Sequence, residues 1–267
     1  MLKIVTSSPD GARRPSWKGF VVLNVVNQGE KGDVFVGMDK PRLFPGRYGP
    51  PIGEVLNMTR GEVILVNADI DLNLGGADLS QFKGGLAFSG RIDTPGGFLN
   101  PWAVDLFVYD DALVSSLKEA GGWEKFQLGG PWWDYVLPVA ALCLGLPVWR
   151  ITSPVAFHQI HERRWSQSDY LIGAAAARKH LGSLGFHGPE KASEFSKACR
   201  DFFMENAEEA PILSGPANDL AWRYATLSPH PFDPRRTAPW PKRLERRARP
   251  YLKSAAKLLG HGKRKDG

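Results

Sequence analysis

Short apolar runs alternate with stretches of helical character along the first part of the chain. The runs are rich in Val, Ile, Leu and Phe, and most are bounded by Gly, Pro, Asn or Asp, which is typical of strands. Predicted strands span residues 3–6, 20–26, 33–37, 62–66, 85–88, 105–109 and 147–151. Residues 53–58 and 132–144 are predicted to form helices between them. This alternation predicts an α/β fold with a mostly parallel central sheet flanked by helices.

The pattern changes near Ile151, where strands give way to helical segments. We expect helices over residues 169–181, 189–206 and 216–224. Five prolines within residues 228–241 indicate a linker, or a loop that packs on the body of the protein.

Positive charge is concentrated at the C-terminal end of the chain. The net charge is +6, but residues 235–267 hold twelve Lys or Arg and two acidic residues, so the preceding residues carry a net charge of −4. We therefore predict one domain with a core over residues 1–165 and a helical part over 166–234, followed by a compositionally distinct tail over 235–267.

The tail has the pattern of a basic amphipathic helix. Residues 242–259 place apolar side chains at helical spacing, although Pro250 would kink such a helix. This pattern is typical of an element at an anionic membrane surface, and a helix docked on the body with a solvated basic face is an equal alternative. Nucleic acid is a weaker expectation, because the body is acidic and lacks a groove of interleaved basic and aromatic residues.

Several classes of protein are not favoured by the composition. No apolar run reaches 18 residues, which argues against a transmembrane helix, and the first residues lack the apolar region and cleavage site of a signal peptide. Cys143 and Cys199 are too few for a disulfide framework, and we expect both to be buried thiols in a reducing compartment. A cytoplasmic protein, in peripheral contact with the inner face of the membrane through its tail, is the expectation that follows.

The most informative segment is an acidic cluster that follows a predicted strand. The apolar run Val63–Val66 leads directly into Asp69 and Asp71, and ligands of open α/β sheets bind outside the carboxyl ends of strands. Alternate residues of an extended segment share a face, so both carboxylates are expected to point into one cavity. Mg²⁺ or Mn²⁺ would relieve their repulsion, because hard cations take oxygen ligands. The alternative is that Asp69 caps a turn and Asp71 is solvated.

These segments resemble the GT-A nucleotide-diphospho-sugar transferases, in which a D-x-D motif follows a central strand as Asp69-Ile70-Asp71 does here. Further similarities occur in the family's order, over about residues 1–165. They are the first strand and loop Lys3-Ile4-Val5-Thr6-Ser7-Ser8, the preceding Asn67, the stretch Ser89-Gly90-Arg91-Ile92-Asp93, the strand Asp105-Leu106-Phe107 and the acceptor-side loop Gly129-Gly130-Pro131-Trp132-Trp133-Asp134. The resemblance implies that Thr6, Ser7, Ser8, Asn67, Asp69 and Arg91 bind the nucleotide.

The loop before residue 134 suggests an acceptor site. Asp134 falls in the first turn of a predicted helix, where the helix dipole is expected to lower the pKa of its carboxyl and keep it ionised. An ionised carboxylate can act as general base toward a sugar hydroxyl, and Trp132 and Trp133 would offer flat faces to sugar rings. The alternative is that Asp134 is only a helix cap and both tryptophans belong to the core.

A second polar cluster follows the last predicted strand. His158 and His161 lie three residues apart and would share a face on a helix or turn, as candidate metal ligands. Arg163 and Arg164 are suited to bind a diphosphate. The spacing is not H-E-x-x-H and no Cys accompanies it, so a structural zinc site is not expected. A surface helix with solvated charges is the alternative.

The sequence therefore predicts a metal-dependent glycosyltransferase that moves a sugar from a nucleotide-sugar to the hydroxyl of a saccharide or glycolipid acceptor. Asp134 would be the base if the anomeric centre is inverted, and would position the acceptor if the configuration is retained. A metal-dependent phosphohydrolase or nucleotidyltransferase with the same acidic cluster is one alternative. A non-catalytic protein that binds membrane or nucleic acid through its tail is another.

Overall fold

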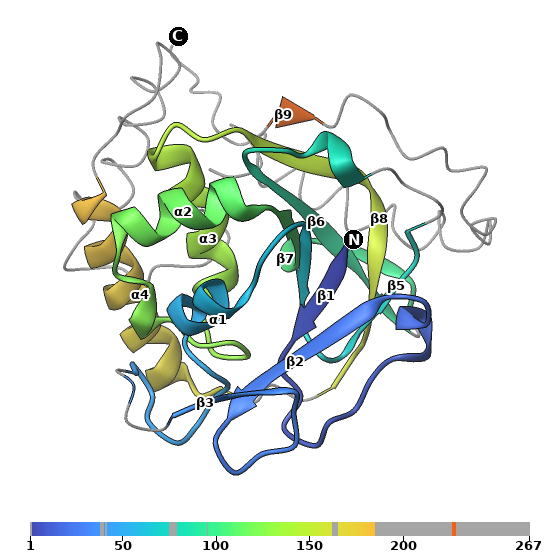
Figure 1. Cartoon of the computed structure of the whole chain (residues 1–267), viewed down its shortest axis with the longest axis horizontal. Helices are drawn as coiled ribbons and strands as arrows, with labels where there is room; N and C mark the ends of the chain where they lie inside the picture. Colours follow the sequence, from blue (N-terminus) through green and yellow to red (C-terminus); the bar gives the residue numbers. More distant parts are fainter. Residues whose placement is uncertain are drawn as a thin grey trace, which may run out of the picture.

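The fold consists of a mixed nine-stranded sheet and four α-helices within the part of the chain that the structure describes (Figure 1). The structure is a computed structural model that describes residues 2–37, 40, 42–74, 79–94, 96–161, 165–184 and 226–227. The expected α/β class is confirmed. The predicted helices over 189–206 and 216–224, the proline-rich segment and the basic tail lie outside the described residues.

The sheet runs in the order β3-β2-β1-β4-β7-β6-β8-β5, and β9 pairs with β8. Its strands are β1 (Lys3–Thr6), β2 (Val21–Asn27), β3 (Val34–Val36), β4 (Val63–Val66), β5 (Ile70–Leu72), β6 (Leu86–Thr94), β7 (Phe98–Tyr109), β8 (Val148–Gln159) and β9 (Thr226–Leu227). Strands β1 to β4 are parallel, as are β6 and β8, whereas β7 is antiparallel to β4 and β6, and β5 is antiparallel to β8.

The expectation of a mostly parallel sheet was therefore wrong, and the short connections explain why. Parallel neighbours need a crossover of a dozen or more residues. Only three residues separate β6 from β7, and only three separate β4 from β5. Strand β7 therefore reverses beside β6, and β5 leaves β4 altogether to pair with β8 at the other end of the sheet.

The helices are grouped beside the sheet, towards the left of Figure 1. They are α1 (Ile52–Met58), α2 (Asp111–Ala120), α3 (Trp133–Cys143) and α4 (Gln167–Ser183). Three of them match predicted helices, and α2 was not predicted. Asp110 starts α2, because its carboxylate accepts hydrogen bonds from the backbone N–H groups of Ala112 and Leu113.

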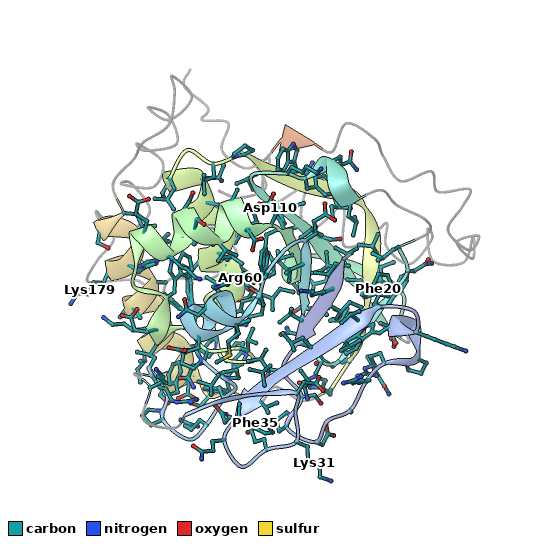
Figure 2. The ribbon with its side chains drawn as sticks, in the orientation of Figure 1. Phe20, Lys31, Phe35, Arg60, Asp110 and Lys179 are labelled. Atoms are coloured by element: carbon teal, nitrogen blue, oxygen red, sulfur yellow. The ribbon has the colours of Figure 1, made fainter. Side chains whose placement is uncertain are left out.

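Two hydrophobic cores lie on opposite faces of the sheet. Along β4, Val63 and Leu65 belong to the core that includes the four helices, whereas Ile64 and Val66 belong to the second core. The fully apolar run Val63–Val66 is therefore buried on both faces of the sheet. Side chains fill the space between helices and sheet, while Phe35 of the edge strand β3 is 52% exposed (Figure 2). The predicted strand over residues 20–26 is buried only in its second half, since Val21 is 47% exposed.

The described residues bear on the expectations about a transmembrane helix and about the two cysteines. None of the described helices has the length and apolar composition needed to span a membrane. Cys143 is a buried free thiol in α3, as expected, and Cys199 lies outside the described residues.

Candidate functional site

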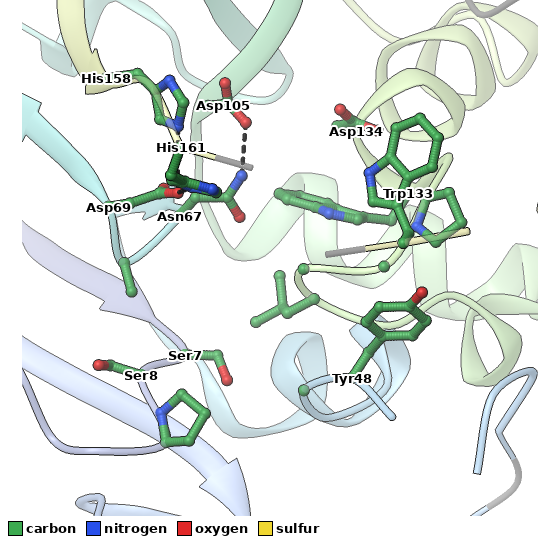
Figure 3. A pocket seen from close by; sticks show the side chains of 18 of the residues that line it. Ser7, Ser8, Tyr48, Asn67, Asp69, Asp105, Trp133, Asp134, His158 and His161 are labelled. Atoms are coloured by element: carbon green, nitrogen blue, oxygen red, sulfur yellow. Dashed lines mark hydrogen bonds and ion pairs between the residues drawn. The ribbon is translucent and has the colours of Figure 1, made fainter. Parts of the chain in front are cut away.

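A cavity of about 1260 Å³ lies outside the carboxyl ends of β1 and β4. Ser7 and Ser8 enter it directly after β1, and Asn67 and Asp69 enter it after β4 (Figure 3). The Oγ of Ser7 is buried and has no hydrogen-bond partner among the described residues. Thr6, which was predicted to contact the nucleotide, is fully buried and is not part of the cavity lining. The site that the sequence predicted at this end of the sheet is therefore present as a cavity.

Asp69 and two histidines form a cluster on one side of this cavity. The Oδ2 of Asp69 lies 2.7 Å from Nε2 of His161 and 3.3 Å from Nε2 of His158. Their ligand atoms all lie within 4.8 Å of one another. The antiparallel pairing of β5 with β8 sets Ile70 opposite His158, and this register brings together residues about 90 positions apart. Two imidazole nitrogens and one carboxylate oxygen that converge in this way are suited to hold a divalent metal ion.

Asp69 and the two histidines interact strongly through hydrogen bonds and charge. Burial opposes the imidazolium of His158, but its hydrogen bonds to Asp69 and Asp93 outweigh burial and raise its pKa to about 9. Burial also opposes ionisation of Asp69, yet the hydrogen bonds from His158 and His161 hold the pKa of that carboxyl well below its usual range. A proton and a metal ion therefore compete for the same imidazole nitrogen.

A chain of hydrogen bonds and ion pairs leads from His158 through Asp93 to two residues of the cavity lining, Arg91 and Asp105. His158 Nδ1 lies 3.0 Å from Oδ1 of Asp93, whose other close partner is Nε of Arg91 at 2.9 Å. Arg91 also pairs with Asp105, and Asp105 accepts a hydrogen bond from Asn67 at 2.5 Å, drawn as a dashed line in Figure 3. Burial lowers the pKa of Arg91, but Asp105 and Asp93 more than compensate and raise it. Arg91 lines the cavity as predicted, with its guanidinium held by two carboxylates.

Asp71 does not join this cluster, so the expectation that it shares the cavity with Asp69 was wrong. Its carboxylate accepts a hydrogen bond from Ser16 Oγ at 2.9 Å and lies 3.9 Å from Nη1 of Arg14. Asp69 lies in the turn before β5, whereas Asp71 is inside that strand and is absent from the cavity lining. The alternation of side chains therefore does not extend across the turn, and Asp71 is not part of the candidate metal cluster.

Asp134 lines the same cavity from the first turn of α3, on the side away from the histidines (Figure 3). The prediction that the helix dipole lowers its pKa was wrong. Burial, with the nearby charge of Asp105, raises the pKa of Asp134 well above its usual value. The cause is that removal from water disfavours the carboxylate more than the helix terminus favours it. A carboxylate whose pKa lies closer to neutral is a stronger base once it is ionised.

The two tryptophans before Asp134 belong largely to the core rather than to an exposed patch. Trp132 and Trp133 are 1% and 2% exposed, although both contribute to the cavity lining. Trp133 packs against Phe107 with ring centroids 5.3 Å apart. Trp132 adopts a positive φ of 81°, a conformation that costs a non-glycine residue on the order of 1–3 kcal/mol and is often found at functional sites. The alternative that both tryptophans are core residues is closer to the structure.

The structure also shows residues of the site that the sequence did not single out. Asp93 and Asp105 lay inside segments cited only for resemblance, and only the pairing of β6 with β7 and β8 brings them to His158 and Arg91. A buried Asp169 at the start of α4 binds the OH of Tyr48 and the guanidinium of Arg47. An acidic residue three positions after Ser166 is the local signal for this capping position. Arg163 and Arg164, predicted to bind a diphosphate, lie outside the described residues.

Comparison of the chain with models of known protein families gave no match, and comparison with curated proteins gave none either.

Proposed function

We propose that this protein is a metal-dependent glycosyltransferase with a GT-A type fold, which moves a sugar from a nucleotide-sugar donor to an acceptor hydroxyl. The observation that carries this proposal is the content of one cavity. A candidate metal cluster of Asp69, His158 and His161 lies on one side and Asp134 lies on the other, while the Ser7–Ser8 loop at the end of β1 lies below the cluster in Figure 3. The resemblance described above supports this arrangement for Asp69 and Asp134, but not for Asp71, which lies outside the cavity.

The three cluster residues fit a divalent cation by chemistry as well as by position. Because His158 Nδ1 faces Asp93, a proton on that nitrogen leaves Nε2 free to act as the ligand atom. A cation bound there would neutralise charge on a diphosphate leaving group. The open side of the cluster faces the cavity, where the phosphate oxygens of a donor would complete the coordination.

Asp134 is the residue of this cavity best suited to activate an acceptor. In transfer with inversion, the bond from the anomeric carbon to the phosphate oxygen breaks, the bond to the acceptor oxygen forms, and Asp134 takes the hydroxyl proton. In transfer with retention, Asp134 would position the acceptor. Its raised pKa supports either role, because a protonated carboxyl donates and an ionised one accepts a hydrogen bond.

The direct test is to incubate the purified full chain with UDP-, GDP- and dTDP-sugars in the presence of Mn²⁺. We expect at least one donor to raise the melting temperature in a metal-dependent manner and to release nucleoside diphosphate. Asp69→Asn should lose both effects, and Asp71→Asn is the matched control, since Asp71 lies outside the cavity. Release of nucleoside monophosphate would instead support a phosphohydrolase. A chain that binds no nucleotide-sugar with any metal would contradict the proposal.

A further inference from the structure

Aromatic side chains from three separate segments line one part of the cavity. Tyr48 comes from the loop before α1, Trp165 and Tyr170 come from the start of α4, and Trp132 comes from the turn before α3. The rings of Trp165 and Tyr170 are stacked, with centroids 5.3 Å apart and planes inclined by 23°. Trp132 contacts the ring of Tyr170 at 5.3 Å. We name Tyr48, Trp165 and Tyr170, backed by Trp132, the aromatic wall.

The aromatic wall is fixed by partly buried hydrogen bonds. The carboxylate of Asp169, only 2% exposed, accepts from the OH of Tyr48 at 2.7 Å and from Nη1 of Arg47 at 2.6 Å. The indole Nε1 of Trp132 donates to the backbone carbonyl of Tyr170 at 3.0 Å. Burial of a carboxylate is unfavourable unless its oxygens are paired. Asp169 therefore ties the loop of Tyr48 to the start of α4 before any ligand arrives.

Three of the wall side chains are partly exposed to the cavity. Tyr48, Trp165 and Tyr170 are each of intermediate exposure and line the cavity, whereas Trp132 behind them is buried. Figure 3 shows Tyr48 on the same side of the cavity as Trp133 and Asp134, away from His158 and Asp69. A ligand on the wall would therefore lie beside the candidate base and apart from the metal cluster.

We propose that the aromatic wall is the acceptor subsite and that it binds an uncharged saccharide, an inference that rests on the proposed function. The C–H face of a pyranose ring is apolar and matches a flat aromatic surface, while its hydroxyls need polar partners at the rim. Asp134 and Tyr48 offer such partners in the same cavity. Among the described residues, Arg47 is the cation next to Tyr48, and its charge is already neutralised by Asp169, which disfavours an anionic acceptor at this position.

A nucleobase is the other ligand that stacks on aromatic rings, and the experiment is designed to separate the two. The full chain is titrated by saturation-transfer NMR with the methyl glycosides of glucose, galactose, mannose, rhamnose and N-acetylglucosamine. The affinity for nucleoside diphosphate with Mn²⁺ is measured in parallel by calorimetry. We expect at least one glycoside to bind. Trp165→Ala should reduce the affinity for that glycoside by about ten-fold or more. Trp165→Phe, which keeps a ring, should reduce this affinity less.

Phe35→Ala is the matched control, because Phe35 is an exposed aromatic residue of β3 outside the cavity (Figure 2). Melting curves establish that each variant is folded. The acceptor subsite is refuted if nucleoside diphosphate binds and no glycoside does, a result that leaves the proposed function standing. It is equally refuted if Trp165→Ala weakens the nucleotide and leaves the glycoside unchanged, since the wall would then hold the base. If the wild-type chain does not bind nucleoside diphosphate with Mn²⁺, the proposed function itself is contradicted.

Discussion

Replacement of Asp93 should weaken metal binding although Asp93 is not one of the three cluster residues. Its Oδ1 lies 3.0 Å from Nδ1 of His158, the imidazole that is 5% exposed and presents Nε2 to Asp69. A carboxylate at this position fixes the orientation of the ring and makes the opposite nitrogen a better ligand. Asp93→Ala removes both effects. Asp93→Asn keeps an oxygen that can accept from Nδ1 but removes the charge.

The expected magnitude follows from the role of such outer partners at metal sites. Their loss typically costs about 10–100-fold in metal affinity, or about 1.4–2.7 kcal/mol. We place Asp93→Asn near the lower end and Asp93→Ala near the upper end. Arg91 keeps its second partner Asp105 in either variant, so the Arg91–Asp105 ion pair in the cavity lining is not lost.

Titration with Co²⁺ is the suitable assay, because its visible absorption reports the ligand geometry while calorimetry gives the affinity. Two imidazoles and one carboxylate also predict tighter binding of Mn²⁺, Co²⁺ or Zn²⁺ than of Mg²⁺, which prefers oxygen ligands. The measurements should be compared at pH 7 and near pH 9. Loss of Asp93 should also lower the affinity of His158 for the proton that competes with the metal at pH 7. This weaker competition partly masks the loss of metal affinity. Wild-type metal affinity in Asp93→Ala at both pH values would refute the reasoning.

Four further outcomes are expected. Asp134→Asn should reduce sugar transfer by about 10²-fold or more with little change in donor affinity, as measured by product formation and calorimetry. Asp71→Asn should bind Co²⁺ with wild-type affinity, and a loss equal to that of Asp69→Asn would return Asp71 to the metal site. Burial lowers the pKa of His180 to about 4 from 6.5, so its contribution to stability is complete above pH 6.5 and lost as the pH falls towards 4. The contribution of His180 to the free energy of unfolding should therefore fall by about 3 kcal/mol across that range, and urea titrations should show a smaller fall in His180→Gln than in wild type. The full chain should sediment with vesicles of anionic lipid at low salt and be released at high salt, because residues 235–267 carry excess positive charge. Vesicle binding that does not depend on salt would exclude an electrostatic contact.

The position of the candidate site could be predicted from local patterns in the sequence. The fully apolar run of β4 ends at Asn67 and Asp69, and parallel strands of an α/β sheet present their carboxyl ends to ligands. The loop after β1 follows from the same rule. Both features depend on a few adjacent residues, which is why the cavity lies where the sequence placed it.

The features that the sequence did not reveal depend on contacts between distant segments. The predicted strand ended at residue 151, but β8 continues to Gln159 because β5 and β6 both pair along its second half, which makes His158 a strand residue. The tryptophans at the start of α3 were expected to offer their faces to a ligand, but residues distant in the sequence cover them, such as Phe107 on Trp133. Tyr170, whose carbonyl accepts from Trp132, is 38 positions away. The raised pKa of Asp134 likewise reflects burial, which a local pattern does not contain.

The candidate metal cluster depends on the register of three strands at a single position. His158 in β8 is paired with Asp93 of β6 on one side and with Ile70 of β5 on the other. A slip of one residue in either pairing would turn the partner side chain to the opposite face of the sheet. Strand β5 is the weaker of the two partners, since it has three residues and lies at the edge of the sheet.

The contacts of Asp71 explain how so short a strand keeps its register. Ser16 Oγ donates to Asp71 and accepts from the backbone N–H of Leu72, and the indole of Trp17 donates to the carbonyl of Ile70 at 3.1 Å. The short 3₁₀ turn Pro15–Trp17 thus holds β5 by three hydrogen bonds. The second Asp of the D-x-D pattern would then serve the metal site by fixing the strand that follows Asp69, rather than by ligation. This is why Asn, which can still accept from Ser16, is the informative substitution at position 71.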